Sequence, residues 1–258
     1  MNADWRTRYD FAMDVAHQAG QFALQYYNQG IAVEWKADHS PVTLADRGAE
    51  QLLRSAIASK FPGDGFLGEE FGDTPGTSGY RWIVDPIDGT RSFVRGLPIW
   101  ATLVGLEYKG ELIAGVAYAP ALGQTHRALR GDGAYCDNRR IRVSDVATLD
   151  KSHVYYSSIA WFKKAKRDKQ FLKLVDLTER QRGVGDYYCF MLVAQGAGEI
   201  AIEYGVHAWD IAALAPIVEE AGGKFTSWNG AFDLNRPDVL ATNGKMHAET
   251  LRVINEPV

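Results

Sequence analysis

Residues 82–90 of this chain, Trp-Ile-Val-Asp-Pro-Ile-Asp-Gly-Thr, constrain its fold more than any other stretch. The aromatic and aliphatic residues at its start predict a buried β-strand, and Pro86 cannot donate a hydrogen bond to a neighbouring strand. We therefore expect the strand to end at this proline, with Asp85 and Asp88 at its carboxyl end. Ligand sites of layered α/β proteins concentrate at the carboxyl ends of strands, so the pattern favours a layered fold with a site here.

A turn with two carboxylates and a carbonyl freed from the sheet suits a hard cation. Asp85 and Asp88 supply the carboxylates, and Ile87 supplies the carbonyl. Mg²⁺ prefers oxygen ligands and commonly binds together with a substrate phosphate. A D-x-x-D pair on its own is also typical of a solvated acidic turn, so the prediction depends on the rest of the chain.

Composition and charge exclude several classes of function. The chain has 258 residues, of which 46% are hydrophobic and 23% charged, which suits one large domain or two small ones. The net charge of −4 without a basic run argues against nucleic-acid binding, and no apolar stretch is long enough to span a membrane. The first residues lack the apolar core of a secretory signal. Cys136 and Cys189 stand far apart without a CxxC, which favours a reducing cytoplasm over a disulfide framework or a zinc site.

Hydrophobic periodicity predicts alternating helices and strands along the whole chain. Helices are expected at about 5–27, 44–60, 168–179, 187–197 and 209–221 and after 242, and strands at 33–36, 65–68, 81–85, 99–107, 112–119, 124–129, 154–157, 200–204, 224–228 and 238–242. Lys109-Gly110 marks a hairpin turn, and Gly222-Gly223 marks a helix end. This order predicts a layered α/β or α+β sandwich. We expect one domain over 1–258, with sub-halves of about 1–150 and 151–258 that meet at a cleft.

Four further carboxylates stand at the predicted ends of elements. Asp46 lies in the first turn of a predicted helix, where it would complement the helix dipole. Glu69 and Glu70 follow a strand and a glycine, as residues of a solvated loop do. Asp210 opens a predicted helix and would be its N-cap by default. Each residue alone has this ordinary explanation, but their joint occurrence with the two aspartates above indicates a shared site.

The combination of Gly68-Glu69-Glu70, residues 85–90 and Trp209-Asp210, with Asp46 upstream, resembles the inositol monophosphatase superfamily. The resemblance covers nearly the whole chain, and D-P-I-D-G-T with a distant W-D is highly specific. It implies a layered αβαβα sandwich of the inositol monophosphatase and fructose-1,6-bisphosphatase type. It also implies a magnesium-dependent, lithium-sensitive phosphomonoesterase that acts on a small phosphorylated metabolite and forms homodimers.

The resemblance further implies which residues hold the metal. Glu69, Asp85 and the Ile87 carbonyl would hold one Mg²⁺. Asp85, Asp88 and Asp210 would hold a second, with Asp85 bridging the two ions. Glu69 would also help to hold a weaker third ion, so two or three Mg²⁺ per site are expected.

Other site residues follow from the same resemblance. Asp46 would accept a hydrogen bond from Thr90, and the two would orient the attacking water. Glu70 would be an outer acid to which we assign no role. Lys36 matches a lysine near the entrance of the family's site, although an exposed strand lysine needs no function.

The chemistry of phosphate-monoester hydrolysis is consistent with this arrangement. Its loose transition state places charge on the phosphoryl oxygens, so catalysis is mainly positioning and charge neutralisation, which two cations supply. Gly89 would let the backbone approach the phosphate, and residues 90–93 predict a short helix whose first amides face an anion. Arg91 and Arg95 are either phosphate contacts or surface charges. The site carries no Cys or Ser nucleophile motif, which favours direct attack by water over a phospho-enzyme.

Residues 88–103 and 183–188 resemble the histidinol-phosphate phosphatase branch of this superfamily. Histidinol phosphate bears a protonated amine and an imidazole, so we expect Asp186 to bind the ammonium and Glu203 to bind the imidazole or the ammonium. Two alternatives stay open. Asp186 is equally explained as the cap of a helix that starts at Tyr187, and inositol phosphatases also place a glutamate at the Glu203 position.

The sequence leaves rival functions and several residue roles open. The same chemistry on inositol 1-phosphate, adenosine 3′,5′-bisphosphate or fructose 1,6-bisphosphate is the first alternative, and a non-catalytic phosphate-binding descendant is the second. Trp100 is expected in the core and His207 in a hydrogen-bonded loop, whereas Tyr187 and Tyr188 suit either core or pocket. Residues 159–170 place two aromatics before five basic residues, which predicts either a solvated helix start or a cap over the cleft.

Overall fold

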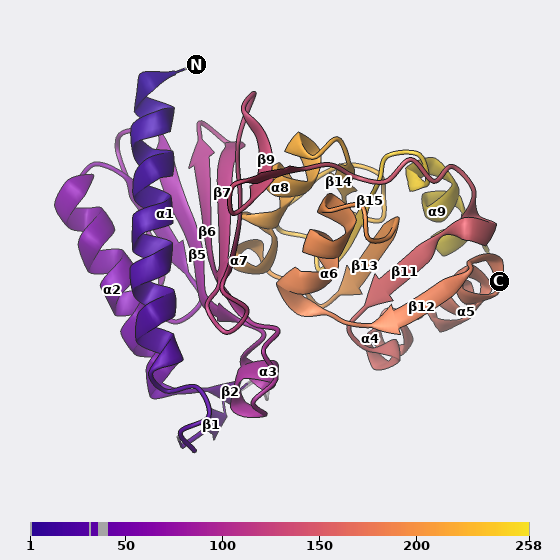
Figure 1. Ribbon diagram of the computed structural model, residues 1–258, viewed down its shortest axis with the longest axis horizontal. Helices are drawn as coiled ribbons and strands as arrows, with labels where there is room; N and C mark the ends of the chain where they lie inside the picture. The colour runs from indigo at the N-terminus through magenta and orange to yellow at the C-terminus, as the bar shows by residue number, and fades with distance from the viewer. Residues whose placement is uncertain (1, 31, 36–40, 258) are drawn as a thin grey trace.

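Two β-sheets alternate with three layers of helices in the computed structural model, which describes residues 2–30, 32–35 and 41–257. In Figure 1, helices α1 and α2 form one outer layer, and α6, α7 and α8 lie between the two sheets. Helices α4, α5 and α9 accompany the second sheet at the far side. This order of layers confirms the predicted αβαβα sandwich.

The larger sheet contains, among the described residues, eight strands in the order β10-β9-β8-β7-β6-β5-β3-β4. Their bounds are β3 (Gly65–Gly68), β4 (Gly72–Thr74), β5 (Tyr80–Asp88), β6 (Ala101–Tyr108), β7 (Glu111–Ala119), β8 (Gln124–Leu129), β9 (Gly133–Cys136) and β10 (Arg139–Ile141). The turn between β6 and β7 is Lys109-Gly110 as predicted, and both residues have positive φ. The strands predicted at 65–68, 99–107, 112–119 and 124–129 are confirmed within a few residues at their ends, whereas β4, β9 and β10 were not predicted.

Strand β5 does not end at Pro86, and the prediction of an end there is wrong. The strand continues to Asp88, and its pairing with β6 shifts register between Asp85 and Asp88. At such a bulge the backbone leaves the ladder, so the missing N–H of Pro86 costs no ladder hydrogen bond. The Pro86 carbonyl instead accepts a hydrogen bond from Thr102 Oγ1 at 2.8 Å.

Helices α1 (Ala3–Leu24) and α2 (Leu44–Lys60) pack side by side on the outer face of the larger sheet (Figure 1). Helix α1 begins after Asn2, whose side chain accepts hydrogen bonds from the first turn. Helix α2 has its predicted bounds because Thr43 and Asp46 form a capping box at its start. The short strands β1 (Glu34–Trp35) and β2 (Pro41–Val42) pair with each other before α2, and the remainder of the loop predicted at 38–41 lies outside the described residues.

The smaller sheet has the strand order β12-β11-β13-β15-β14. The elements of this half are β11 (His153–Tyr156), α4 (Ile159–Lys164), α5 (Asp168–Leu177), β12 (Arg180–Gly183), β13 (Ile200–Tyr204), β14 (Lys224–Thr226), β15 (Asp238–Thr242) and α9 (His247–Ile254), preceded by a 3₁₀ turn at Leu149–Lys151. Phe162, Phe171 and Trp228 stack in its core. The edge strand β12 was not predicted, because its residues are mostly exposed and polar.

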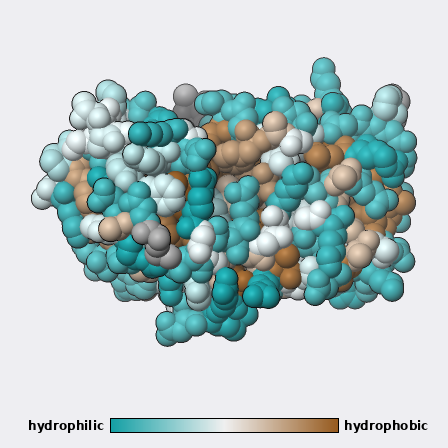
Figure 2. All heavy atoms as spheres, turned by 90° about the horizontal axis from the view of Figure 1, so that it is seen from above, coloured by the Kyte–Doolittle hydropathy of each residue, from teal (hydrophilic) through white to brown (hydrophobic). Residues whose placement is uncertain are grey.

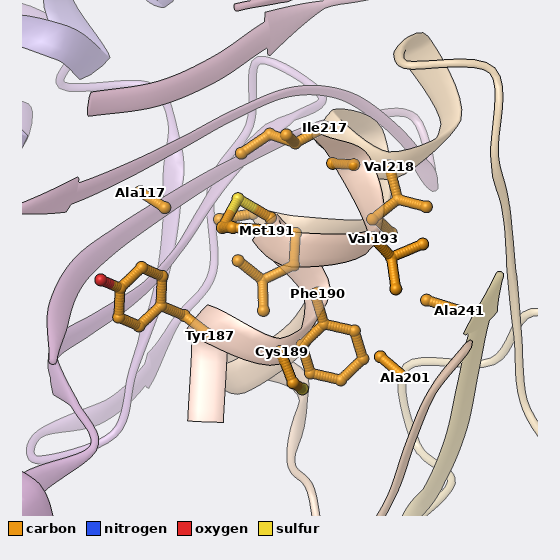
Figure 3. Packing of buried hydrophobic residues seen from close by; sticks show 14 of the residues in the cluster. Ala117, Tyr187, Cys189, Phe190, Met191, Val193, Ala201, Ile217, Val218 and Ala241 are labelled. Carbon is orange, nitrogen blue, oxygen red and sulfur yellow. The ribbon is translucent and has the colours of Figure 1, made fainter. Parts of the chain in front are cut away.

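Helix α6 (Asp186–Ala194) is buried between the two sheets (Figure 3). Phe190 contacts the smaller sheet near Ala201, while Met191 faces Ile217 of the neighbouring helix α8. A helix that is apolar on all sides fits only such an interior position.

The helix predicted at 209–221 is two short helices, α7 (Ala208–Ile211) and α8 (Leu214–Glu220). A continuous helix would press the ring of Pro216 against the Ala212 carbonyl, which explains the break. The break packs on glycines of the larger sheet: a Cβ on Gly105 would lie 2.8 Å from the Ala212 carbonyl carbon, and one on Gly115 would lie 1.9 Å from the Ala213 carbonyl oxygen.

No helix in the described part of the chain has the length and apolar character that a membrane span requires. Figure 2 shows hydrophilic side chains over most of one face of the molecule, with hydrophobic ones gathered in smaller areas.

Candidate active site

The end of β5 brings together three aspartates from distant parts of the sequence. One carboxylate oxygen of each of Asp85, Asp88 and Asp210 lies within 4.8 Å of the others. Asp210 arrives from α7, where its Oδ2 accepts a hydrogen bond from the His207 N–H at 2.7 Å and so caps the helix. Asp85 Oδ1 accepts the Ile87 N–H at 2.9 Å, which turns the backbone at the bulge.

The electrostatics of this cluster fit a bound cation. Asp85 and Asp88 are buried, and burial raises the pKa of both carboxyls well above the usual range. The next causes for Asp85 are the negative charges of Glu69 and Asp88, and for Asp88 those of Asp186 and Asp210. Clustered carboxylates that repel one another are stabilised by a divalent cation, and an all-oxygen donor set suits Mg²⁺ or Mn²⁺.

The turn between β3 and β4 carries Glu69 and Glu70, both half-buried. Glu69 lies close enough to Asp85 and Asp88 to raise the pKa of both, and Glu70 acts on Asp46 in the same way. The structure thus places the Gly68-Glu69-Glu70 motif against the aspartate cluster.

Asp46 lies beside the cluster with its carboxylate fixed from two sides. The N–H and Oγ1 of Thr43 donate to Asp46 Oδ2 at 2.7 and 2.6 Å. Thr90 Oγ1 lies 3.3 Å from Asp46 Oδ1 and 3.0 Å from the Ile87 carbonyl. Burial raises the pKa of Asp46 to about 6. Thr43 was not predicted, although a threonine before a helix is a recognisable N-cap.

Gly89 starts helix α3 (Thr90–Val94) with φ of +84°, a conformation that favours glycine. A Cβ there would lie 3.0 Å from the Ile99 carbonyl and 3.1 Å from Asp186 Oδ2. The backbone at the end of β5 therefore approaches its neighbours closely, and Asp186 stands directly against it.

A cavity of about 410 Å³ opens beside the cluster and connects it to the second half of the chain. Its lining includes Asp88, Arg91, Asp186, Glu203 and Asp210. Glu203 is buried on β13, where it accepts a hydrogen bond from Ser157 Oγ at 2.5 Å, and burial raises its pKa to about 8.

Asp186 does not cap helix α6, so the alternative interpretation of this residue is wrong. Helix α6 begins at Asp186 itself, and its Tyr187 N–H donates to Asp88 Oδ2 at 2.6 Å. Asp186 has φ of +56°, and its carboxylate accepts a long hydrogen bond from Ser92 Oγ at 3.4 Å. Burial raises the pKa of its carboxyl to about 6, and the negative charge of Asp210 is the second cause of this increase.

Part of segment 159–170 does line this cavity. Within it Trp161 lines the cavity, as do Ser157 and Ser158 just before the segment, and the Trp161 ring packs so closely on Gly205 that a Cβ there would lie 3.0 Å from it. Lys166, Arg167 and Lys169 line a separate cavity beside the C-terminal helix. The wall of the cleft is thus the aromatic start of the segment rather than the basic residues that follow. Of the two aromatics that the sequence singled out, Trp161 lines the cavity and Phe162 is buried in the core.

The other singled-out residues lie as follows. Trp100 is buried in the core, as expected. Tyr187 is also buried in the core, one of the two positions that the sequence left open, and Tyr188 packs half-buried against the cluster that contains Tyr187. Arg91 lies over the Trp35 ring at 5.9 Å. His207 stacks on Trp209 with its ring centroid 4.9 Å away. Lys36 lies outside the described residues.

Comparison with known proteins places this site in a family. The model of the inositol monophosphatase family matches residues 4–257. The chain belongs to the inositol monophosphatase family. A histidinol-phosphatase of Mycobacterium tuberculosis is 42% identical over 87% of this chain and 88% of its own length, and one of Chlorobaculum parvum is 41% identical over 85% of each. Among solved structures, an inositol monophosphatase from Anabaena superposes with a TM-score of 0.86 at 29% identity, covering 98% of this chain and 96% of that one.

Proposed function

We propose that this phosphoric monoester hydrolase of the inositol monophosphatase family converts L-histidinol phosphate to L-histidinol and phosphate, with Mg²⁺ as its cofactor. The main observation behind this proposal is the aspartate cluster, which lies beside a cavity lined by two further carboxylates, Asp186 and Glu203. The relatives named histidinol-phosphatase, at 42% and 41% identity, support this substrate over others of the family.

Five groups would hold the metal ions. We assign Glu69, Asp85 and the Ile87 carbonyl to one Mg²⁺, and Asp85, Asp88 and Asp210 to a second, with Glu69 also serving a weaker third. Bound there, the ions would neutralise charge on the phosphoryl oxygens and lower the pKa of the attacking water. The protein's part is to hold these oxygen ligands close together in a buried site, which the mutual repulsion of the free carboxylates otherwise opposes.

Asp46 and Thr90 would orient the attacking water. The Thr90 hydroxyl has one proton and two acceptors within reach, Asp46 Oδ1 and the Ile87 carbonyl. When the carbonyl is engaged by a cation, the proton goes to Asp46, and the lone pairs of Thr90 Oγ1 are left to accept from water. With its pKa raised to about 6, Asp46 is suited to accept a proton near neutral pH.

Asp186 and Glu203 would bind the leaving group. The negative charge of Asp186 contributes to the raised pKa of Glu203, so a cationic ligand between them would favour the ionised form of both carboxyls. A charge-assisted hydrogen bond of this kind is worth about 1.5–3 kcal/mol. The hydroxyls of an inositol phosphate carry no charge and give the ionised carboxylates no such stabilisation, which favours the ammonium and imidazole of histidinol phosphate.

The deciding experiment compares kcat/KM, with Mg²⁺ present, for L-histidinol phosphate, inositol 1-phosphate and adenosine 3′,5′-bisphosphate. We expect a preference for histidinol phosphate above roughly 100-fold, or about 2.7 kcal/mol of differential transition-state binding. Comparable or inverted rates would leave the metal chemistry in place and move the substrate to inositol phosphate or another small phosphate.

The homodimer implied by the sequence resemblance stays a prediction. Sedimentation equilibrium of the purified chain tests it directly, and a mass of one chain at micromolar concentration would contradict it.

A further inference from the structure

Glu50 is a buried carboxylate outside the aspartate cluster; it accepts two backbone amides, and its Oε1 also lies 3.8 Å from the Arg54 guanidinium one turn along the helix. It lies on α2 with its side chain fully buried. Its Oε2 accepts the Glu70 N–H at 2.7 Å, and its Oε1 accepts the Phe71 N–H at 3.0 Å. Burying a carboxylate is costly unless it is hydrogen-bonded, so these two amides, together with the nearby charge of Arg54, make its position tolerable.

The amides belong to the turn that carries Glu69. This turn joins β3 to β4, and β4 is the edge strand of the larger sheet. The pairing of Gly68 with Gly72 closes the hairpin, which leaves the N–H groups within the turn without ladder partners. Both carboxylate oxygens of Glu50 take up these donors from below, and a charged acceptor makes such bonds stronger than neutral ones.

The glycine before Glu69 is explained by the same contact. A Cβ built on Gly68 would lie 2.1 Å from Glu50 Oε1 and 2.8 Å from its Oε2. The space beneath the turn is therefore already filled by the Glu50 carboxylate. The Gly68-Glu69-Glu70 motif and Glu50, on different elements, form one structural unit.

We propose that Glu50 is a positioning residue for the metal site: by holding the Glu69 turn from beneath, it fixes Glu69 where it binds a cation together with Asp85. The inference rests on the proposed function only for the identity of Glu69 as a ligand. Groups that orient metal ligands from outside commonly change metal affinity 10–100-fold when substituted.

The test uses Glu50→Gln, which keeps the shape of the side chain but turns an NH₂ group toward one of the two amides. Mg²⁺ binding to the full chain without substrate is measured by calorimetry, and amide hydrogen exchange is measured over residues 69–71. We expect Mg²⁺ affinity to fall about 10-fold, with faster exchange of the Glu70 and Phe71 amides and KM for the phosphomonoester little changed at saturating Mg²⁺.

Arg54 supplies a matched control on the same helix. Its guanidinium donates to the Gly72 carbonyl at 2.9 Å and to Thr74 Oγ1 at 2.7 Å, so it mainly holds the β4 side of the hairpin. It also lies 3.8 Å from Glu50 Oε1, but its removal leaves both hydrogen bonds from the turn amides to Glu50 in place. Arg54→Gln should lower thermal stability while leaving Mg²⁺ affinity within twofold of wild type. If Glu50→Gln speeds amide exchange but keeps wild-type Mg²⁺ affinity, Glu50 is only structural and the proposal is overturned.

Gly68→Ala serves as a second variant if Glu50→Gln does not fold. Its methyl group would displace the Glu50 carboxylate, and it should weaken Mg²⁺ binding in the same way; wild-type affinity would contradict the proposal. Asp85→Asn separates this inference from the proposed function. If Asp85→Asn keeps Mg²⁺ binding, the metal assignment itself fails, whereas loss in Asp85→Asn together with retention in Glu50→Gln refutes the positioning role alone.

Discussion

Asp88 connects the aspartate cluster to the middle layer of helices. One of its oxygens lies with those of Asp85 and Asp210, while Oδ2 accepts the first free amide of α6, that of Tyr187. The negative charge thus also stabilises a helix N-terminus, where an anion is favoured. The fold should therefore tolerate the loss of the Asp88 charge, whereas a metal site built on Asp88 should not.

Asp88→Asn should therefore abolish turnover while the protein stays folded. The asparagine oxygen still accepts the Tyr187 N–H, but the neutral side chain is a much weaker ligand for a divalent cation. We expect kcat to fall by more than about 100-fold, beyond what outer-shell substitutions typically cause, with an unchanged circular dichroism spectrum. Turnover near the wild-type rate would refute the metal assignment.

Asp186→Asn tests the proposed amine contact. The variant keeps the shape that Ser92 contacts and removes only the charge. We expect kcat/KM for L-histidinol phosphate to fall roughly 10–100-fold, mainly through KM, since a charge-assisted hydrogen bond is worth about 1.5–3 kcal/mol. Inositol 1-phosphate is the comparison substrate, and an equal loss of kcat/KM on both substrates would contradict the proposed contact between Asp186 and the amine.

At the scale of elements, the break between α7 and α8 positions Asp210. Ala212 and Ala213 lie against Gly105 and Gly115, where a side chain on either glycine would collide with the helix backbone. This close approach of helix to sheet brings α7 down to the end of β5. The two glycines are thus part of what places Asp210 beside Asp85.

Gly115→Ala should destabilise the protein through this contact. Its methyl group would lie 1.9 Å from the Ala213 carbonyl oxygen, and overpacking of this kind costs about 1–3 kcal/mol. Thermal unfolding should show a midpoint lower by several degrees. Gly63→Ala is the control, because its Cβ would meet no atom nearer than 3.6 Å, and a comparable loss there would contradict the packing argument.

The sequence predicted elements wherever local signals and tertiary packing agree. Helix α2 has a capping threonine and an apolar face, and Lys109-Gly110 is a strong turn signal, so both were predicted correctly. The break at Ala212-Ala213 was missed because alanines favour helix, although Pro216, four residues after Ala212, is a sequence signal for it. The bulge at Pro86 depends likewise on pairing with β6.

The site residues were predictable to the extent that a motif carries them. The sequence named the aspartates that the structure brings together, because their spacing is specific. It did not name Glu50, since a glutamate within an amphipathic helix is normally a surface residue. Ser157 and Trp161 reach the cavity through the arrangement of β11 and α4, which periodicity does not specify.

At the scale of the whole molecule, His126 lies in the interface between the larger sheet and the middle helices. It is fully buried on β8, its Nε2 is 3.0 Å from Gln195 Nε2 at the end of α6, and Asp137 and Arg139 are the nearby charges. Burial lowers the pKa of the imidazole from 6.5 to about 4. The folded protein therefore keeps this histidine neutral.

This burial should make the fold sensitive to mild acid. Above pH 6.5 the imidazole is neutral in both states; as the pH falls toward 4, only the unfolded chain gains the proton, so the free energy of unfolding drops by about 3 kcal/mol. We expect the difference in unfolding free energy between wild type and His126→Gln, measured in urea at several pH values, to shrink by this amount. The common effects of the carboxylate cluster cancel in the difference, and a constant difference would contradict the prediction.

The proposed metal site takes its ligands from β5 and from α7, with the rest of the larger sheet from β6 onward, three of the five strands of the smaller sheet and α6 between them in the sequence. During synthesis on the ribosome, Asp85 and Asp88 leave the exit tunnel long before Asp210. A nascent chain accordingly offers an incomplete ligand set, and tight capture of a cation has to wait until most of the second half has been made. On the proposed ligand assignment, the set is completed only by a chain that has made the larger sheet and three of the five strands of the smaller sheet.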